Sequence, residues 1–163
     1  MEKRLANNYA VYSFELSHHK IYYKIQYNNT AITNISKLNY VPTEMGVPTP
    51  LTNSVFSQLS EYFSAERKHF DFKYELKGTE FQLRVWNALK TIPYGETRTY
   101  KDIATQIGNA KASRAVGMAN NKNPLAIIIP CHRVIGAKGN LVGYASGLDI
   151  KKSLLTLEQE NSK

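Results

Sequence analysis

The chain's only cysteine stands beside a histidine, directly after an apolar run over residues 125–129. It belongs to the string Pro130-Cys131-His132-Arg133-Val134. The thiolate is the nucleophilic form of cysteine, and a nearby histidine is a common base for forming it. The pattern indicates a reactive cysteine, and the chain contains no second thiol that would reduce or replace it.

A second interpretation stays open at this stage, because a single cysteine at the end of a buried strand also serves as a small apolar filler. Pro130 favours the reactive interpretation, since proline has no N–H and ends strand pairing. We therefore expect residues 131–134 to turn sharply at the mouth of a sheet. Adjacent side chains in a strand point to opposite faces, so His132 is expected to act on Cys131 through a turn or a bridging water.

Length and composition bound the class of protein. The chain has 163 residues, of which 42% are apolar, enough to bury a core in one domain or two small ones. A single cysteine excludes an internal disulfide and fits a reducing compartment. No apolar stretch is long enough for a signal peptide or a membrane span. We expect a soluble protein of the cytoplasm, or of the nucleus in a eukaryote.

The net charge of +8 is concentrated in the second half of the chain. Residues 1–74 carry 8 Lys and Arg against 6 Asp and Glu, whereas residues 75–163 carry 13 against 7. Within residues 98–138 the only acidic residue is Asp102, against Arg98, Lys101, Lys111, Arg114, Lys122, Arg133 and Lys138. Such a stripe is typical of a phosphate-binding surface, although a solvated basic face has the same composition.

Residues 1–74 are predicted to form a small α+β domain. Alternating apolar residues over 9–17 and 20–27 indicate two antiparallel strands, and a turn at Asn28-Asn29 leads to a less regular strand near 31–40. A loop rich in proline precedes helical spacing over residues 55–63, and its aromatic side chains are predicted to be core. The histidines here, His18, His19 and His69, lack zinc-site spacing, so we expect no metal.

Residues 75–163 have a different pattern, with three predicted helices before the cysteine. Thr79 is expected to cap the first helix, which ends before Pro93, and Thr99 opens the second with a capping box. The third begins near Lys111; Ala112, Ala115, Val116 and Ala119 are expected inward, with Lys111, Arg114, Met118 and Asn121 on the opposite face. The last two suggest a helix-turn-helix, and residues 136–140 suggest a hairpin-like wing.

The final helix is predicted over residues 148–160, with Ile150, Leu154 and Leu157 inward. Glu158 lies one turn beyond Leu154 on nearly the same stripe. A carboxylate there faces both burial and the negative end of its own helix. Glu158 is therefore expected to have a partner.

These motifs match a known family, and the chain resembles the O6-alkylguanine-DNA alkyltransferases, also called methylated-DNA–protein-cysteine methyltransferases. The match is dense over residues 78–158 and follows only the general plan over residues 1–74. Five segments carry it: Gly78-Thr79-Glu80-Phe81-Gln82, Thr91-Ile92-Pro93-Tyr94-Gly95, Ser113-Arg114-Ala115-Val116-Gly117, Asn123-Pro124 and Pro130-Cys131-His132-Arg133-Val134-Ile135-Gly136.

The resemblance implies direct reversal of DNA damage. The alkyl group on O6 of guanine, and less readily on O4 of thymine, would pass irreversibly to Cys131, so each molecule would act once. The family's Glu-His-water-Cys chain maps onto Glu158, His132 and Cys131, with Asn123 bracing the turn. No cofactor is implied. The partner would be double-stranded DNA, bound by a monomer with no membrane association.

The resemblance also implies a DNA surface and a base pocket. Because a stacked guanine cannot present its O6-alkyl carbon, the nucleotide must be flipped. Arg114 would fill the vacated space, and Tyr100 would press on the target phosphate and touch the base. The small residues would let the recognition helix enter the minor groove. The DNA-binding set is Tyr100, Lys111, Ala112, Arg114, Ala115, Gly117 and Arg133, and the pocket set is Tyr100, Val134, Tyr144, Ala145 and Ser146.

The expected fold is α+β, with an N-terminal ribonuclease-H-like sheet and helix and a C-terminal winged-helix-like domain. Two departures from the family matter: Ser146-Gly147 replaces a frequent pair of glycines, which puts large adducts in doubt, and the zinc ligands of some relatives are missing. Two rival functions stay open. One is a non-reactive damage-sensing DNA-binding protein, which Cys131 argues against, and the other is a Cys-His hydrolase, which turnover on small esters or peptides would reveal.

Overall fold

The structure is a computed structural model that describes residues 8–163. The chain divides into two compact units, Met1–Glu75 and Leu76–Lys163. Residues 1–7 lie outside the described residues. The predicted start of the N-terminal domain falls among them, as does the segment in which no signal peptide is expected.

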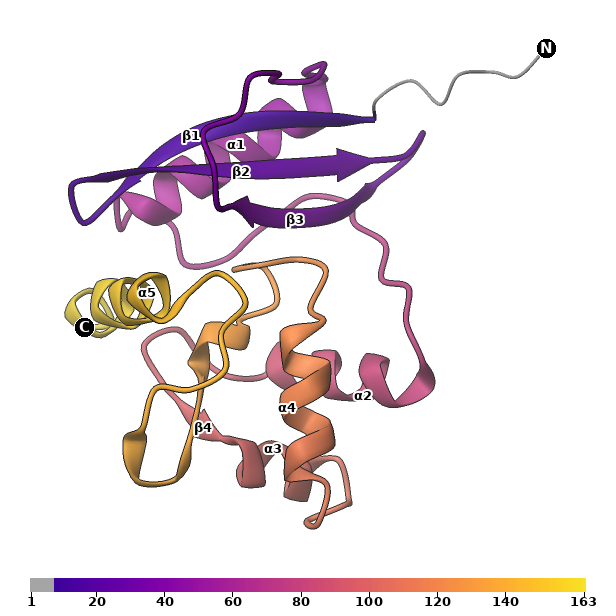
Figure 1. Cartoon of the computed structure of the whole chain (residues 1–163), viewed down its shortest axis with the longest axis vertical. Coiled ribbons are helices and arrows are strands. Elements are labelled where there is room, and N and C mark those ends of the chain that lie inside the picture. The colour runs from indigo at the N-terminus through magenta and orange to yellow at the C-terminus, as the bar shows by residue number, and fades with distance from the viewer. Residues whose placement is uncertain (1–7) are drawn as a thin grey trace. The chain divides into compact units, whose positions relative to one another are not determined.

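The N-terminal unit is built on an antiparallel meander of β1 (Tyr9–Leu16), β2 (His19–Tyr27) and β3 (Ile32–Leu38), in the order β1-β2-β3 (Figure 1). The β1–β2 turn is two residues long, with φ of 50° at Ser17 and 65° at His18, as tight hairpins require. The turn before β3 is held by Asn28, whose side-chain oxygen accepts hydrogen bonds from the backbone N–H groups of Thr30 and Ala31. The predicted meander is confirmed.

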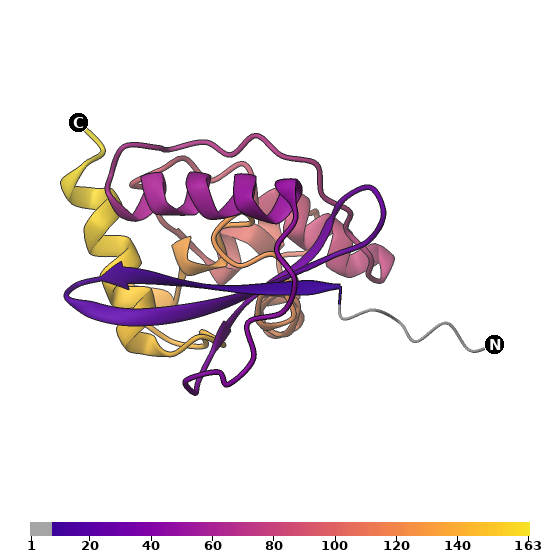
Figure 2. The same ribbon diagram turned by 90° about the horizontal axis from the view of Figure 1, so that it is seen from above.

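Helix α1 (Pro50–Phe63) runs along the sheet of this unit (Figure 2). It begins five residues before the predicted stripe because Thr49 caps it and Pro50 suits a first helical position. The centre of the Phe56 ring lies 4.8 Å from that of Tyr12, on which it stacks, and the centre of the Phe63 ring lies 5.1 Å from that of Phe14. Tyr62 is fully buried, and Phe56 and Phe63 are half-buried against the strand aromatics, so the helical aromatics pack inward as predicted.

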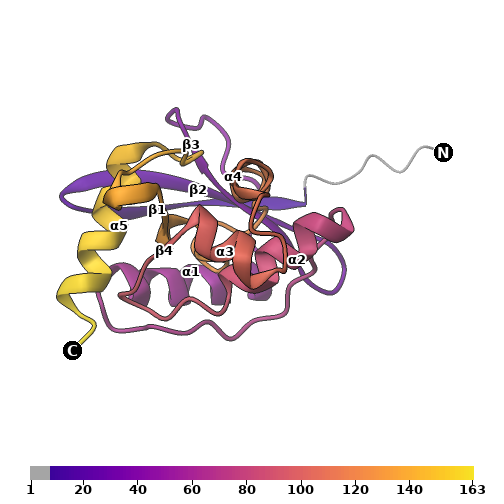
Figure 3. The same ribbon diagram turned by 90° about the horizontal axis from the view of Figure 1, so that it is seen from below.

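The C-terminal unit contains α2 (Glu80–Leu89), α3 (Tyr100–Gln106), α4 (Ser113–Asn121) and α5 (Leu148–Glu160), and Figure 3 shows α2, α3 and α4 gathered in one group. Thr99 forms the predicted capping box with Asp102, and Thr79, which was expected to cap its helix, also forms a capping box, with Gln82. The Trp86 indole N–H donates to the Ala119 carbonyl at 2.9 Å and fastens α2 to α4. The predicted α+β class is confirmed.

Two local predictions for this unit are wrong. Residues 125–129 form a tight turn instead of a strand: Ile129 N donates to Leu125 O at 3.0 Å, and Ile127 has φ of 72°. On α4, Ala115 is exposed, because Val116, Ala119 and Asn120 form the buried face.

The hairpin-like turn expected over residues 136–140 is present. Gly136 N donates to Asn140 O at 2.7 Å around the 3₁₀ turn Ala137–Gly139. The preceding strand, β5 (Val134–Ile135), pairs in parallel with β4 (Arg98–Thr99).

Candidate active site

Cys131 lies in a short 3₁₀ turn, Cys131–Arg133, that places three consecutive side chains in the interior. The Arg133 N–H donates to the Pro130 carbonyl at 2.9 Å and closes the turn, so the predicted sharp bend after Pro130 is confirmed. Cys131 is only 5% exposed. A substrate atom therefore reaches the sulfur only through a pocket or after local movement.

Two asparagines brace this turn from the end of α4 and the segment behind it. Asn123 Nδ2 donates to the Ile129 carbonyl at 2.7 Å, and Asn123 Oδ1 accepts from the Leu125 N–H at 2.9 Å. Asn120, which the sequence analysis did not assign, is 2% exposed and donates to the Cys131 carbonyl at 3.4 Å. Its signal in the sequence is a polar residue on the inward stripe of α4.

Glu158 is fully buried at the end of α5 and collects donors from the active-site turn. Its Oε1 lies 2.7 Å from His132 Nε2 and accepts from Arg133 Nη2 at 2.8 Å, and its Oε2 accepts from Arg133 Nε at 2.8 Å. The expected partner of Glu158 is thus present. Arg133 also donates to the Ile92 carbonyl at 2.7 Å and is only 7% exposed, so its predicted place on the DNA surface is wrong.

Burial and the neighbouring charges shift the pKa values of both Glu158 and His132. Burial works to raise the pKa of Glu158, but the hydrogen bonds and charges of His132 and Arg133 hold that pKa well below its usual range. Burial lowers the pKa of His132, against the opposite effect of Glu158. A neutral imidazole beside a carboxylate donates through Nε2–H, which makes Nδ1 its proton-accepting nitrogen.

The Cys131 thiol is not activated by its surroundings alone. Burial raises its pKa, and a hydrogen bond from Asn123 and the charge of Lys151 act in the opposite direction. The thiol is therefore the resting form at neutral pH. Nucleophilic attack requires a base that removes the proton, and His132 is the neighbouring residue with that capacity.

Lys151 is a second buried residue of the site that the sequence analysis missed. It is fully buried on α5, and its Nζ donates to the carbonyls of Val134 at 2.5 Å and Val142 at 2.9 Å. Its signal in the sequence is its spacing, since position 151 lies on the helical stripe that also carries Leu154, Leu155 and Glu158. The next lysine, Lys152, is exposed.

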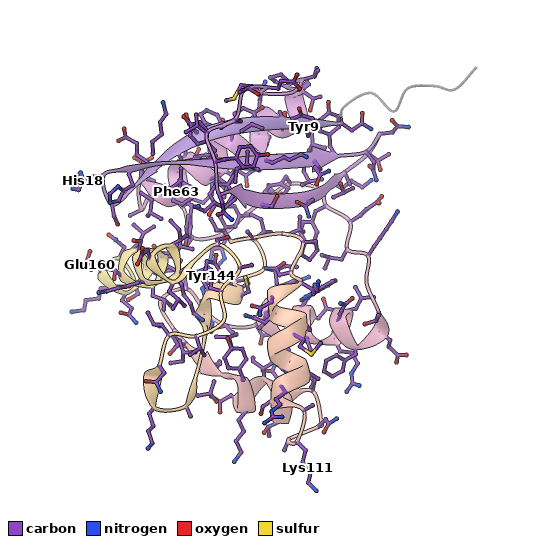
Figure 4. All side chains as sticks on the ribbon, viewed as in Figure 1. Tyr9, His18, Phe63, Lys111, Tyr144 and Glu160 are labelled. Carbon is purple, nitrogen blue, oxygen red and sulfur yellow. The ribbon has the colours of Figure 1, made fainter. Side chains whose placement is uncertain are left out.

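The expected DNA-facing residues lie on the helix-turn-helix of α3 and α4. Lys111, Arg114 and Ala115 are exposed, and Ala112 and Gly117 are half-buried; Lys111 projects from the turn before α4 (Figure 4). Five of the seven predicted basic residues of this region are exposed: Lys101, Lys111, Arg114, Lys122 and Lys138. Arg98 is half-buried and paired with Glu96 at 2.9 Å. The remaining charge is a candidate phosphate-binding surface.

A pocket of 330 Å³ opens on this helix pair, lined by Tyr100, Ser113, Arg114, Gly117, Asn121, Val142 and Gly143. The Tyr100 hydroxyl donates to the Val142 carbonyl at 3.0 Å across its edge. Of the predicted base-pocket residues, Tyr100 lines it, whereas Val134 is fully buried and, like Cys131, is not on its wall. Tyr144, Ala145 and Ser146 lie on the loop before α5 and do not line this pocket, whose loop side is formed by Val142 and Gly143.

Neither a metal centre nor a membrane-spanning helix is found within residues 8–163. No group of three or more His, Cys, Asp and Glu side chains in that part of the chain is arranged to hold a metal ion. None of the helices described there is long and apolar enough to cross a bilayer.

Comparison with known proteins identifies the class to which this site belongs. Residues 80–160 match the family model of the 6-O-methylguanine DNA methyltransferase, DNA binding domain. The chain is 71% identical over 101 residues to the methylated-DNA–protein-cysteine methyltransferase of Methanosarcina acetivorans, covering 62% of this chain and 65% of that protein. The matched part is thus slightly less than two thirds of that relative's length.

Similarity to mycobacterial proteins extends over more of the chain. The methylated-DNA–protein-cysteine methyltransferase of Mycobacterium tuberculosis is 49% identical over 139 residues, which cover 83% of this chain and 84% of that protein. The crystal structure of Mycobacterium tuberculosis OGT in complex with DNA matches with a TM-score of 0.79 and 46% identity, covering 86% of this chain and 88% of that one.

The C-terminal unit is therefore a DNA-binding domain of the methyltransferase type, carrying a single buried cysteine. The chain belongs to the methylated-DNA–protein-cysteine methyltransferase family.

Proposed function

We propose that this protein repairs DNA by taking the alkyl group from O6 of guanine onto Cys131. The observation that carries the proposal is the arrangement of a single thiol in a buried turn, next to a neutral histidine that is oriented by a buried carboxylate. These are the parts that a cysteine nucleophile and its base require. Family membership supplies the substrate class.

The transfer is a displacement at the alkyl carbon. The thiol proton passes to His132 Nδ1, directly or through a water, and the sulfur attacks the carbon. A C–S bond forms, the C–O6 bond breaks, and its electron pair stays on O6, while the departing base takes up one proton to become guanine. The imidazolium that forms lies beside the Glu158 carboxylate, which stabilises its charge.

The substrate would be double-stranded DNA, held by the basic helix-turn-helix. Because O6 of guanine lies inside the duplex stack, the damaged nucleotide must be flipped out. Arg114, exposed on α4 and on the wall of the pocket, would take its place in the stack, and Tyr100 would meet the flipped base. The exposed Ala115 and half-buried Gly117 leave room for a close approach to the minor groove, which is about 6 Å wide.

The product, an S-alkylcysteine, has no route back to the thiol within this chain, since no other cysteine is present. We propose a single reaction per molecule, with O4-alkylthymine as a poorer substrate and no cofactor. We further propose that the protein acts as a monomer in the compartment that holds the chromosome, the cytoplasm in a prokaryote.

A transfer experiment tests the proposal. Protein is incubated with a duplex containing one O6-methylguanine, and the intact mass is measured for the parent chain and for Cys131→Ser. The parent is expected to gain one methyl group, mapped to Cys131, while Cys131→Ser retains duplex binding and gains nothing. Methylation at another residue, or hydrolysis of small esters with repeated turnover, would contradict the proposal.

A further inference from the structure

Met118 is an exposed apolar side chain on the helix that carries Arg114, and the proposed chemistry does not use it. It is 71% exposed, more than any other large apolar side chain of the C-terminal unit. It follows Arg114 by four residues on α4, so the two side chains lie one turn apart on the same face. Met118 is therefore placed to contact the same partner as Arg114.

A groove of 240 Å³ lies beside Met118. Its walls come from the start of α2 and from α4, which pack side by side (Figure 3). The Trp86 indole fastens the two helices through the Ala119 carbonyl, so the groove is preformed. Its apolar lining is Phe81, Ala115, Met118 and Ala119, and its polar lining is Thr79, Gln82 and Lys122.

The polar lining of the groove contains one charge. Thr79 and Gln82 hold each other in the capping box of α2, where each backbone N–H donates to the side chain of the other, at 3.0 Å and 3.1 Å. Lys122 is exposed and is the single charged residue of the lining. An apolar hollow with one cation complements a ligand that carries an anion beside an apolar body.

The groove and the 330 Å³ pocket lie on opposite sides of the exposed face of α4. Gly117 lines the pocket and Ala115 lines the groove, the ridge of Arg114 and Met118 separates them, and the two linings share no residue. A helix in the minor groove of DNA, which is about 6 Å wide, has one strand on each side. With Tyr100 on the side of the damaged strand, the α2–α4 groove faces the complementary strand.

We propose that this groove binds the backbone of the complementary DNA strand, with Met118 and Phe81 against a deoxyribose and Lys122 at the adjoining phosphate. The inference rests on the proposed function, which assigns the damaged strand to the Tyr100 side of α4. The C–H surface of a deoxyribose is apolar and each phosphate carries a negative charge, so the two parts of the backbone match the two parts of the lining. The flexible, polarizable methionine side chain suits such an irregular surface. This contact holds the complementary strand in place while the damaged nucleotide leaves the stack.

Duplex binding tests the groove without methyl transfer. Affinity is measured by fluorescence anisotropy in the Cys131→Ser background, with a duplex that contains one O6-methylguanine. Met118→Ala is expected to weaken binding about tenfold, because it removes most of the apolar surface that covers the sugar. Met118→Leu is expected to keep most of the affinity. Val41→Ala, which truncates an exposed apolar side chain of the N-terminal unit, is the matched control and should bind like the background protein.

A phosphate scan assigns the strand. One phosphate at a time is replaced by a neutral methylphosphonate, in the complementary strand and then in the damaged strand. One complementary-strand position is expected to weaken binding of the background protein but not of Lys122→Gln, because that variant has already lost the contact. Lys122→Gln should also reduce the slope of log K against log salt concentration by about 0.9. Lys152→Gln, exposed on α5, is the matched control.

An unchanged duplex affinity of folded Met118→Ala, or an unchanged salt slope of Lys122→Gln, would overturn the proposal. Coupling of Lys122 to a phosphate of the damaged strand would overturn it as well. A change in the oligomeric state of Met118→Ala at constant DNA affinity, seen by sedimentation velocity, would instead assign the groove to a second copy of the chain. The Lys122→Gln scan decides the proposal even if Met118→Ala does not fold. If the parent protein transfers no methyl group to Cys131, the proposed function fails, while the phosphate scan still decides what the groove binds.

Discussion

Arg133 and Glu158 form a two-bond ion pair in the interior of the C-terminal unit, with Nε and Nη2 each 2.8 Å from a carboxylate oxygen. The pair joins the active-site turn to α5, since Arg133 directly follows His132 and Glu158 also contacts His132. Its geometry serves the His132 contact, because a carboxylate held on both oxygens keeps a fixed orientation.

Removing Arg133 should therefore destabilise the protein. Arg133→Met leaves a buried carboxylate with two hydrogen bonds fewer and no guanidinium beside it, a change that costs about 3–5 kcal/mol in the free energy of unfolding. Urea unfolding followed by circular dichroism measures it. Exposed ion pairs stabilise a protein by about 0–1 kcal/mol. A loss below about 1 kcal/mol would therefore contradict the burial of this pair.

Glu158→Gln should slow methyl transfer at neutral pH, with the deficit shrinking as pH rises. Glutamine has a similar shape but does not stabilise the imidazolium, so His132 becomes a weaker base. In alkaline solution the thiolate forms without help, and part of the rate returns. Single-turnover transfer to Cys131 across a pH series measures the effect.

Arg133→Met is the comparison for that series, because it removes the ion pair of the same buried carboxylate but leaves a carboxylate at position 158 beside His132. Both variants are compared at temperatures where circular dichroism shows them folded. If Glu158→Gln has the parental rate and pH midpoint, Glu158 is a structural carboxylate and the proposed base arrangement is wrong.

Stability should decrease as the solution becomes acidic. Burial lowers the pKa of His132, so below about pH 6.5 the unfolded chain binds a proton that the folded chain does not, and the unfolding free energy falls by up to about 1.4 kcal/mol per pH unit. Glu158, whose pKa is also lowered, adds its own loss below about pH 4.3, the unfolded value. Urea unfolding at several pH values gives the profile. A flat unfolding free energy between about pH 7.5 and pH 5 would contradict a buried neutral His132.

Arg114→Ala should slow repair of duplex DNA far more than reaction with free O6-methylguanine base. Only the duplex requires an extruded nucleotide to be replaced in the stack. Arg114 is exposed on α4 and outside the Glu158 group, so the loss should not reach the chemical step. Equal losses on both substrates would assign Arg114 to that step instead.

Much of the fold follows from local signals in the sequence. Thr79 and Thr99 start helices where their capping boxes indicate, and alternation gives the meander, because both patterns reflect contacts within a few residues. The strand expected over the apolar run 125–129 is wrong, because a buried turn and a buried strand have the same composition. Ile127 adopts a positive φ that its residue type does not predict.

The site was less predictable where tertiary contacts override residue type. The sequence predicts Arg133 on a basic surface, yet the 3₁₀ turn directs its side chain inward to Glu158. Lys151 reads as an exposed helical lysine, and its burial depends on carbonyls from two distant segments. Glu158 was predictable, since its position on the apolar stripe of α5 already demanded a partner.

The central claim is that Cys131 accepts one alkyl group and then stops. The most direct test mixes the protein with an excess of duplex containing O6-methylguanine and measures restored guanine per protein molecule over time, with the mass of the Cys131 peptide followed in parallel. We predict that restoration ends at one guanine per protein, in step with complete S-methylation of Cys131. Continued restoration beyond one, or restoration while Cys131 stays unmodified, would contradict the account.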